Sequence, residues 1–413
     1  MMTDDFALLI GADLSLRERA IVCTARALAM RVVLLAFPGR RRIANVLADD
    51  IIECDSPMNP QAAVAALRDY VRRRGGRLAA VVPINDFSLK SGSAVAREFG
   101  LPFLDDDVID RCRDKVRMKK AFEAAGIPCA RVIATDEAVL DHDFADGRPV
   151  VFKPTEFGGS GGVRLVHDRA SLRSAWEAAQ QLLHKYAQAA HVNPRRVHIE
   201  EYLDSAQEVS VEVYCTPHGA QVAAITQKFL SPEPYFAEVG HRVPYRGPEA
   251  GEMAKLAQRA CAALGIDRGV AHVEIRTRPE GLYVIEVGAR PGGDRIMDLV
   301  YRAHAIDLYG LHALGYADRF IAHIEPVSRG VAEIGFLKAA PGRIREVRHA
   351  DDAQGILEIA LYKGVGDTSE PLADFQTREG HAEWFWPSGI TPQQELATRT
   401  DALAQTIFVV DPA

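Results

Sequence analysis

The chain has 413 residues, of which 48% are hydrophobic and 25% charged, with a formal net charge of -7 at pH 7. This length exceeds what one hydrophobic core supports, and the composition excludes a disordered chain, so we expect a folded protein of two or three domains. The negative charge argues against nucleic acid as a partner, and no apolar run is long enough to cross a bilayer.

The cysteines indicate the redox environment of the chain. Their spacing contains no C-x-x-C pair, so we expect small, reduced core residues rather than disulfides or a zinc site. Together with the lack of a recognisable signal peptide, this predicts a cytoplasmic protein. The six cysteines are Cys23, Cys54, Cys112, Cys129, Cys215 and Cys261.

The first hundred residues show the alternation of a parallel α/β domain. Short apolar runs at 6–10, 32–36 and 79–83 are separated by helical stretches. Residues 83–87 end a strand at the edge where such sheets usually bind ligands, and a small-molecule contact there is about as well supported as plain loop structure.

A helix is predicted over 110–126, with Lys115 near its start. A lysine at that end opposes the helix dipole, which suggests an anionic partner outside the helix.

A glycine-rich segment follows the predicted strand 149–154, which ends in Lys153. Four glycines surround Ser160 between this strand and a second one at 163–166. The simpler interpretation is a flexible hairpin turn, but a turn does not need four glycines. Their bare backbone amides can fold over phosphates, so we expect an anion-covering flap here, although the spacing is not that of a P-loop.

The middle of the chain predicts strands that border a ligand. A strand at 197–203 runs into a bend, and 208–214 alternates strictly between valines and polar residues. Carboxylates on such a polar face are usually only solvated. The bend could supply backbone hydrogen bonds to an adenine, which makes Glu208 an acceptor for ribose hydroxyls.

A proline-rich loop is expected at 231–244, shortly after Lys228. It carries Glu238 and His241, which could meet a substrate amine and transfer protons. A surface loop with a spare histidine is about as well supported.

Two glutamates face each other in a predicted hairpin. The runs 270–276 and 282–287 flank a three-residue loop at 279–281, and this register places Glu274 directly opposite Glu286. Opposed like charges are destabilising unless a bound divalent cation neutralises them. Two unrelated solvent-facing glutamates are the alternative. Arg290 follows in a glycine turn on the same side as Glu286, so this spot has the groups that bind a metal-phosphate complex.

The other segments from residue 249 onward add no comparable cluster of charged residues. A helix at 249–264 carries an apolar stripe that should pack behind the acidic hairpin, and 297–316 is predicted helical. From about 321 onward short strands alternate with turns, and the aromatic strand 380–386 is interpreted as a domain-packing seam rather than a cofactor site.

Taken together, these motifs resemble the ATP-grasp superfamily of carboxylate ligases, and within it most closely the bacterial L-amino-acid ligases of the alanine:anticapsin ligase type. The motifs are R-D-K at 113–115, K-P with the glycine flap, E-E-Y-L at 200–203, F-x-E-x-G-H at 236–241 and E-x-G-A-R-x-G-G at 286–293. The fold class implied is a multidomain α/β and α+β protein. Its expected parts are a pre-ATP-grasp domain at 1–112, an ATP-grasp domain at 113–320 with its flap at about 130–205, and a mixed C-terminal domain at 321–413.

The resemblance assigns roles to individual residues. Lys115 and Lys153 would hold ATP phosphates. The metal ligands for Mg²⁺, or alternatively Mn²⁺, would be Glu274 and Glu286. The groups covering the phosphates and bordering adenine and ribose would be Gly159, Ser160, Gly161, Gly162, Glu200, Glu201, Leu203 and Glu208. The catalytic and substrate groups would be Arg290, which steadies the transferred phosphate, with Lys228, Glu238 and His241.

One departure concerns Gly288, where many ATP-grasp enzymes have an asparagine metal ligand. The amino-acid ligases share the glycine, so we interpret it as a mark of that subfamily.

The resemblance implies ATP-dependent joining of a carboxylate to an amine, with small molecules, amino acids above all, as substrates. Transfer to a carrier-protein thiol, a purine-type carboxylation or formylation, a non-catalytic nucleotide sensor and an adenylating ligase remain alternatives. A homodimer is a family-level expectation.

Overall fold

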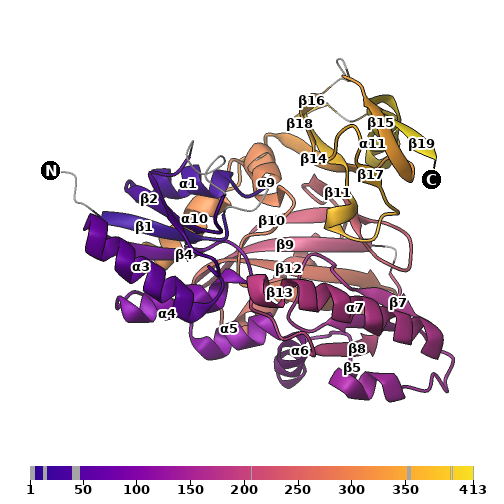
Figure 1. Ribbon diagram of the computed structural model, residues 1–413, viewed down its shortest axis with the longest axis horizontal. Coiled ribbons are helices and arrows are strands. Elements are labelled where there is room, and N and C mark those ends of the chain that lie inside the picture. The colour runs from indigo at the N-terminus through magenta and orange to yellow at the C-terminus, as the bar shows by residue number, and fades with distance from the viewer. Residues whose placement is uncertain are drawn as a thin grey trace.

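A parallel four-stranded sheet forms the N-terminal part of the computed structural model, which describes residues 5–12, 16–39, 47–205, 207–350, 355–390, 392 and 394–412. The strands are β1 (Asp5–Ile10), β2 (Arg31–Ala36), β3 (Asp50–Glu53) and β4 (Arg77–Pro83), in the order β3-β2-β1-β4. The three predicted strands are therefore confirmed, and β3 is an addition. Figure 1 shows this sheet on the left, in indigo.

Helices cover both faces of the parallel sheet. One face packs on α1 (Arg19–Leu28) and α10 (Leu308–Tyr316), and the other on α3 (Pro60–Arg74) and α4 (Ser88–Glu98). This double coverage explains why the strands read as continuous apolar runs instead of alternating ones.

A larger antiparallel sheet forms the centre of the molecule. Its strand order is β13-β12-β9-β10-β11-β14-β18-β16. The strands are β9 (Gln207–Thr216), β10 (Gly219–Leu230), β11 (Glu238–Val243), β12 (Gly269–Arg278), β13 (Gly281–Gly288), β14 (Gly330–Leu337), β16 (Ile356–Leu361) and β18 (Gly380–Pro387).

Helix α8 (Ala250–Leu264) packs behind β12 and β13, as predicted, and its apolar stripe is buried. Two predicted helices are each split. The stretch 110–126 divides into α5 (Asp106–Arg113) and α6 (Lys115–Ala124), because Asp114 is extended and its side chain accepts hydrogen bonds from the amides of Val116 and Arg117. The stretch 297–316 divides into α9 (Ile296–His304) and α10.

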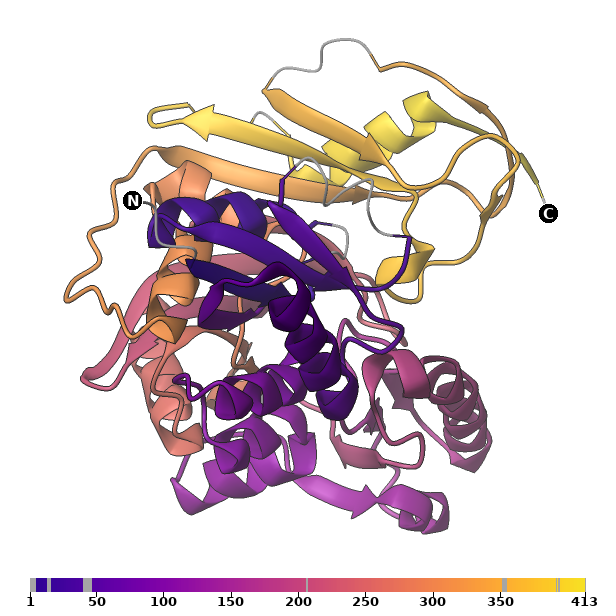
Figure 2. The ribbon, with the colours of Figure 1, turned by 60° about the vertical axis from the view of Figure 1, so that its left-hand side comes forward.

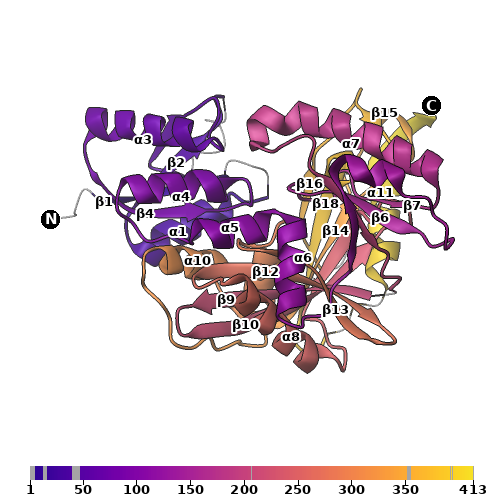
Figure 3. The same ribbon diagram turned by 90° about the horizontal axis from the view of Figure 1, so that it is seen from below.

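A second antiparallel sheet lies over one end of the central sheet. Its order is β5-β8-β6-β7, and α7 (Arg169–Ala190) packs on it. Figure 3 shows α7 with β6 and β7 on one side, and α8 with the central strands on the other. The bounds are β5 (Val132–Thr135), a 3₁₀ turn η1 (Asp136–Asp141), β6 (Val150–Pro154), β7 (Arg164–Val166) and β8 (Val197–Glu201).

The C-terminal third is split between two sheets. Strands β14, β18 and β16 extend the central sheet, whereas β17 (Thr368–Ser369), β15 (Gly342–Val347) and β19 (Phe408–Pro412) form a small sheet of their own. Figure 2 shows these yellow and orange strands running across the top of the molecule, above the indigo parallel sheet.

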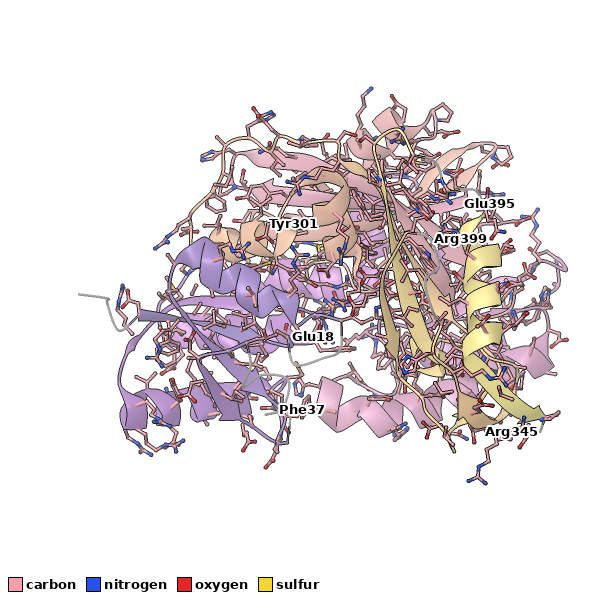
Figure 4. All side chains as sticks on the ribbon, turned by 90° about the horizontal axis from the view of Figure 1, so that it is seen from above. Glu18, Phe37, Tyr301, Arg345, Glu395 and Arg399 are labelled. Carbon is pink, nitrogen blue, oxygen red and sulfur yellow. The ribbon has the colours of Figure 1, made fainter. Side chains whose placement is uncertain are left out.

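Helix α11 (Leu396–Ile407) covers the C-terminal strands. Trp384 and Trp386 of the aromatic strand are buried in the core between this helix and those strands, so they pack within the C-terminal part of the chain rather than at the predicted seam between domains. On the same helix Arg399 donates to the buried Glu333 of β14 at 2.5 Å; Figure 4 labels Arg399 and, one turn earlier, Glu395.

Two further predictions concern membrane-spanning segments and the state of the cysteines. None of the described helices combines the length and apolarity needed to cross a membrane. All six cysteines are free thiols, and four of them are buried.

Candidate active site

The predicted site residues meet in one cleft between the two antiparallel sheets. The sheet β5-β8-β6-β7, with the glycine loop between β6 and β7, forms one wall. The polar faces of β9 to β13 form the other. Fourteen of the sixteen predicted site residues line this cleft: Lys115, Lys153, Gly159, Ser160, Gly161, Glu200, Glu201, Leu203, Glu208, Lys228, Glu238, Glu274, Glu286 and Arg290. Gly162 and His241 do not.

The glycine loop connects β6 to β7. Gly159 and Ser160 have positive φ angles of 66° and 57°. Gly162, at φ 74°, packs against Pro154 of β6, where a Cβ atom would come within 2.9 Å of the proline ring. Gly162 therefore shapes the base of the loop, while its neighbours face the cleft.

Three lysines gather beneath this loop. Lys115 donates to the Phe157 carbonyl at 2.6 Å and lies 3.0 Å from Glu286. Lys153 lies 2.5 Å from Glu200, and Lys119, which the sequence interpretation missed, lies 3.4 Å from the same carboxylate. Lys119 follows Lys115 by one turn of α6, so helical periodicity could have identified it.

Glu200 is an internal counter-ion for these lysines. Its side chain is only 2% exposed. Burial alone would raise its pKa, but Lys119 and Lys153 overcome this and hold the pKa well below its usual value. That Glu200 borders adenine stays a prediction, and its carboxylate also positions two lysines.

Lys228 organises the opposite wall. Its ammonium lies 2.7 Å from Glu274, 2.8 Å from Glu208 and 3.4 Å from Glu238. Burial would lower the pKa of Lys228, yet the three carboxylates raise it well above its usual value. Arg276 donates to the second oxygen of Glu208 at 2.8 Å, so both oxygens of Glu208 already have cationic donors.

Glu274 and Glu286 are directly opposite each other, as predicted, but through different backbone geometry. The turn has two residues, because Arg278 pairs with Gly281 rather than with Leu282. A bulge between Glu274 and Ile275 shifts the register by one residue and restores the predicted pairing.

The two glutamates suit a magnesium ion. Lys228 and His272 both approach Oε1 of Glu274, and Oε2 receives no hydrogen bond from the described residues. Burial would raise the pKa of Glu274, yet Lys228 and His272 hold it well below its usual value, so it is a carboxylate. Mg²⁺ is usually held by one or two carboxylates together with substrate phosphates and water, so two facing glutamates are a sufficient protein contribution. Within the described ranges, no three His, Cys, Asp or Glu side chains form a metal cage.

His272 supports Glu274 from the same strand. It lies 2.8 Å from Glu212 and 3.4 Å from Glu274. Burial lowers its pKa, but Glu212 and then Glu274 raise it to about 9, so the imidazole is charged at neutral pH. His272, Glu274 and Arg276 alternate along β12 and share its cleft face, a pattern that the sequence already contained.

Arg290 is held at the floor of the cleft. Its Nε donates to Asp86 at 2.7 Å, and Asp86 lies in the strand end 83–87 that was expected to contact a ligand. A Cβ atom on Gly288 would come within 3.1 Å of Arg290 and 3.2 Å of Asp86. The glycine at this position therefore leaves room for the ion pair, which a Cβ atom would require to shift by a few tenths of an ångström.

Glu238 and His241 do not belong to a loop, contrary to the expectation for 231–244. They lie on β11, where His241 pairs with Lys228 of β10. Glu238 faces the cleft, but His241 is 1% exposed and directs Nε2 toward Asp294 at 3.5 Å. Asp294 and Arg378, which complete this group, had no motif to identify them.

Known proteins share the fold of this chain and part of its sequence. Residues 147–298 match the family described as the ATP-grasp domain. The chain thus contains an ATP-grasp domain in these residues.

Curated relatives resemble parts of the chain. An uncharacterized protein, y4rH, of Sinorhizobium fredii is 28% identical over 301 residues, which is 71% of this chain and 61% of that protein. A D-alanine–D-alanine ligase of Rhodospirillum rubrum is 29% identical over 192 residues, which is 43% of this chain and 57% of that protein. The matches thus span about three fifths of either relative.

Solved structures share the fold over the whole chain. An L-amino acid ligase from Bacillus licheniformis superimposes with a TM-score of 0.72 at 20% identity, covering 100% of both chains. The biotin carboxylase domain of a Hydrogenobacter thermophilus 2-oxoglutarate carboxylase, solved with MgADP, has a TM-score of 0.69 at 16% identity, covering 94% of this chain and 87% of its own. At these identities the likeness concerns the fold.

Proposed function

We propose that this protein joins the carboxylate of one amino acid or amino-acid-like substrate to the amine of another, and releases ADP and phosphate. The observation that carries this proposal is the pair Glu274 and Glu286 facing each other beneath the glycine loop, with Arg290 at the floor of the same cleft. The similarity to an L-amino acid ligase and to a D-alanine–D-alanine ligase supports the same reaction class.

The chain contains the groups needed for nucleotide binding. Lys115 and Lys153 present ammonium groups to the cleft, and the amides of Gly159, Ser160 and Gly161 cover it. Glu274 and Glu286 would hold Mg²⁺, which supplies positive charge to the phosphate oxygens when bound. We place adenine and ribose next to Glu201, Leu203 and Glu208, where the cleft continues.

Activation of the acid is the first chemical step. A free carboxylate is a poor electrophile, because its charge repels nucleophiles and oxide is not a viable leaving group. The substrate carboxylate attacks the γ-phosphorus of ATP, the bond to the β-γ bridging oxygen breaks, and an acyl phosphate and ADP result. Lys115, Lys153 and Arg290 offset the charge that moves toward ADP.

Amide formation is the second step. The amine attacks the acyl carbon, the bond between that carbon and the phosphate oxygen breaks, and the departing phosphate takes up the proton that the nitrogen loses. Lys228, Glu238 and His241 would serve this half of the site, with Glu238 facing the reactants and His241 acting from behind through Asp294. The closed glycine loop excludes water, which would otherwise hydrolyse the acyl phosphate.

Replacement of Glu286 tests the proposal. Glu286→Gln should leave the fold intact, since the side chain is 25% exposed and keeps its shape, and should abolish ADP release in the presence of amino acids, ATP and Mg²⁺. Glu280→Gln, in the exposed turn of the same hairpin, is the matched control and should retain turnover. Full turnover by Glu286→Gln would argue against this metal site and against the proposal.

Product analysis separates the alternatives. A screen of amino-acid pairs with ATP and Mg²⁺ should yield a condensed product by mass, together with ADP and phosphate. Transfer to a carrier-protein thiol would require the carrier, a purine-type carboxylase or formyltransferase would accept no amino-acid pair, and an adenylating ligase would release AMP. A homodimer is part of the proposal only as a family-level expectation, to be measured by light scattering.

A further inference from the structure

Arg17 lies between the N-terminal sheet and the glycine turn that carries Arg290. It comes just before α1, at the carboxyl edge of the parallel sheet, where the ligands of α/β domains usually bind. Its Nη1 atom donates to the Ile84 carbonyl at 2.6 Å and to the Pro291 carbonyl at 3.4 Å. Two backbone carbonyls thus fix the position of this side chain and leave its charge uncompensated.

Arg17 and Arg290 are adjacent cations. Arg290 also donates to the Pro291 carbonyl, at 3.1 Å, so the Nη1 atoms of the two guanidinium groups share one oxygen atom. Burial lowers the pKa of Arg17, and the neighbouring charge of Arg290 lowers it further, but a guanidinium group stays protonated in proteins. Two positive charges held this close to each other indicate that a negatively charged ligand binds beside them.

The guanidinium group of Arg17 has a free edge. Among the residues that the structure describes, none accepts a hydrogen bond from its Nε or Nη2 atom, and no carboxylate forms an ion pair with it. By contrast, Asp86 accepts from Nε of Arg290 at 2.7 Å and compensates that arginine. Arg17 is partly exposed, and its Nη2 atom lies 3.2 Å from the position that a Cβ atom on Gly293 would take. Nε and Nη2 of one arginine are the parallel donors that a carboxylate accepts from.

The chemistry of amide formation identifies the carboxylate. In the proposed reaction the amine attacks an acyl carbon whose phosphate is held by Arg290. A single carbon separates the nitrogen of an α-amino acid from its carboxylate, so the carboxylate of an attacking amino acid must also lie close to Arg290. Arg290 itself is engaged by Asp86, and Arg17 is the arginine next to it. We propose that Arg17 binds the carboxylate of the amine substrate, which makes that substrate an amino acid rather than a simple amine.

This assignment rests on the proposed function and deepens it. An arginine that binds a carboxylate through two parallel hydrogen bonds fixes the direction of the ligand as well as its position. Arg17 therefore orients the amine substrate with its nitrogen toward the acyl phosphate. Activation of the acid precedes this contact, so the loss of Arg17 should impair the second step of the reaction and leave the first step intact.

Competition between an amino acid and its amide tests the proposal, because the amide removes the charge of the carboxylate with little change in shape. The acid that gives the fastest ADP release is supplied with equal amounts of L-alanine and L-alaninamide, and the two products are quantified by mass. The wild-type protein should favour alanine about tenfold, as expected for a charge-assisted contact. Arg17→Gln should reduce this preference about fivefold. Arg17→Lys keeps the charge but not the two parallel donors, and should reduce the preference at least about twofold even if Arg17→Gln does not fold.

Trapping with hydroxylamine separates this role from a role in activating the acid. Hydroxylamine carries no carboxylate, so hydroxamate should form in both Arg17 variants at the wild-type rate. Arg19→Gln is the matched control, since Arg19 lies in the same part of the chain but is ion-paired with Asp298 at 2.8 Å. This control should keep the preference for alanine.

Three results would overturn the inference while leaving the ligase activity established. They are equal use of alanine and alaninamide by the wild type, a preference that survives in the Arg17 variants, and a loss of hydroxamate formation in those variants. The last result would assign Arg17 to the phosphate instead. Absence of ADP release with every acid would overturn the proposed function and this inference with it.

Discussion

His312 is a buried histidine whose two ring nitrogens hold the N-terminal and central sheets together. Its Nδ1 accepts from the Val270 amide at 2.9 Å, and its Nε2 donates to the Pro83 carbonyl at 2.7 Å. Burial lowers its pKa to about 4, because the charged ring would be desolvated and Nδ1 could no longer accept. The ring is therefore neutral in the folded protein at pH 7.

This pKa predicts acid sensitivity. The unfolded chain binds a proton at about pH 6.5, whereas the folded protein does so only near pH 4, so stability is complete above pH 6.5 and falls as the pH drops toward 4. The loss from this one residue should reach about 3 kcal/mol. In His312→Gln the free energy of unfolding, measured with urea from pH 7 to 4.5, should depend less on pH than in the wild type. The exposed His323→Gln should behave as the wild type, and identical slopes in all three proteins would contradict the prediction.

The facing pair Glu274 and Glu286 shows which contacts between single residues can be predicted from the sequence. Alternation and turn residues were enough to predict that the two carboxylates pair, although the assumed loop was one residue too long and a bulge compensated for it. Arg378 and Asp294 could not be predicted, because their meeting depends on how residues 84 positions apart in the chain are brought together.

At the scale of elements, two neighbouring glycines of the glycine loop should respond differently to replacement by alanine. Gly159 has φ 66°, and a Cβ atom there would lie 2.9 Å from the Phe375 ring, so Gly159→Ala meets both backbone strain of about 1–2 kcal/mol and a clash. Gly158 has no positive φ, and its nearest neighbour would be Asp86 at 3.9 Å.

We expect Gly159→Ala to raise the KM for ATP about tenfold, because the covering conformation of the loop costs an alanine about 1–2 kcal/mol of backbone strain. Gly158→Ala should change it less than about twofold. Steady-state kinetics with ATP as the varied substrate measure both. Equal effects of the two substitutions would show that the conformation of Gly159 is not important for binding ATP.

Elements were predicted well where local signals were strong. The apolar runs of the parallel sheet, the stripe of α8 and the strand-loop-strand order of the flap all appear in the structure. The break at Asp114 was missed because an aspartate inside a charged helical stretch looks ordinary until its side chain is seen capping the next helix. Strand β11 was read as loop because proline and charge dominate 231–244, whereas pairing with β10 and β14 determines its conformation.

At the scale of the whole molecule, the central sheet crosses the expected boundary at residue 321. Strands β14, β18 and β16 lie beyond that point in the chain but continue the sheet that carries the cleft. Ala332, Ile334 and Phe336 of β14 belong to the same core as β9 and β12. No local pattern in the sequence encodes this, since strand order within a sheet depends on distant pairings.

The shared sheet leads to a prediction about truncation. A chain ending at residue 320 would lose three of the eight central strands and leave β11 as an edge with unpaired backbone groups on the side where β14 pairs. It would also lose Arg378, which donates to both oxygens of Asp294, and Glu238 would keep only its longer contact with Lys228.

We therefore expect the 1–320 fragment to aggregate or to be degraded rapidly, and to show no increase in melting temperature with Mg-ATP, whereas the full chain should unfold cooperatively and be stabilised by the nucleotide. Size-exclusion chromatography, limited proteolysis and thermal melts with and without Mg-ATP measure these properties. A monomeric, protease-resistant fragment stabilised by Mg-ATP would contradict this prediction. It would mean that the central sheet is complete without β14, β18 and β16, and that the region around Asp294 and Glu238 folds without Arg378.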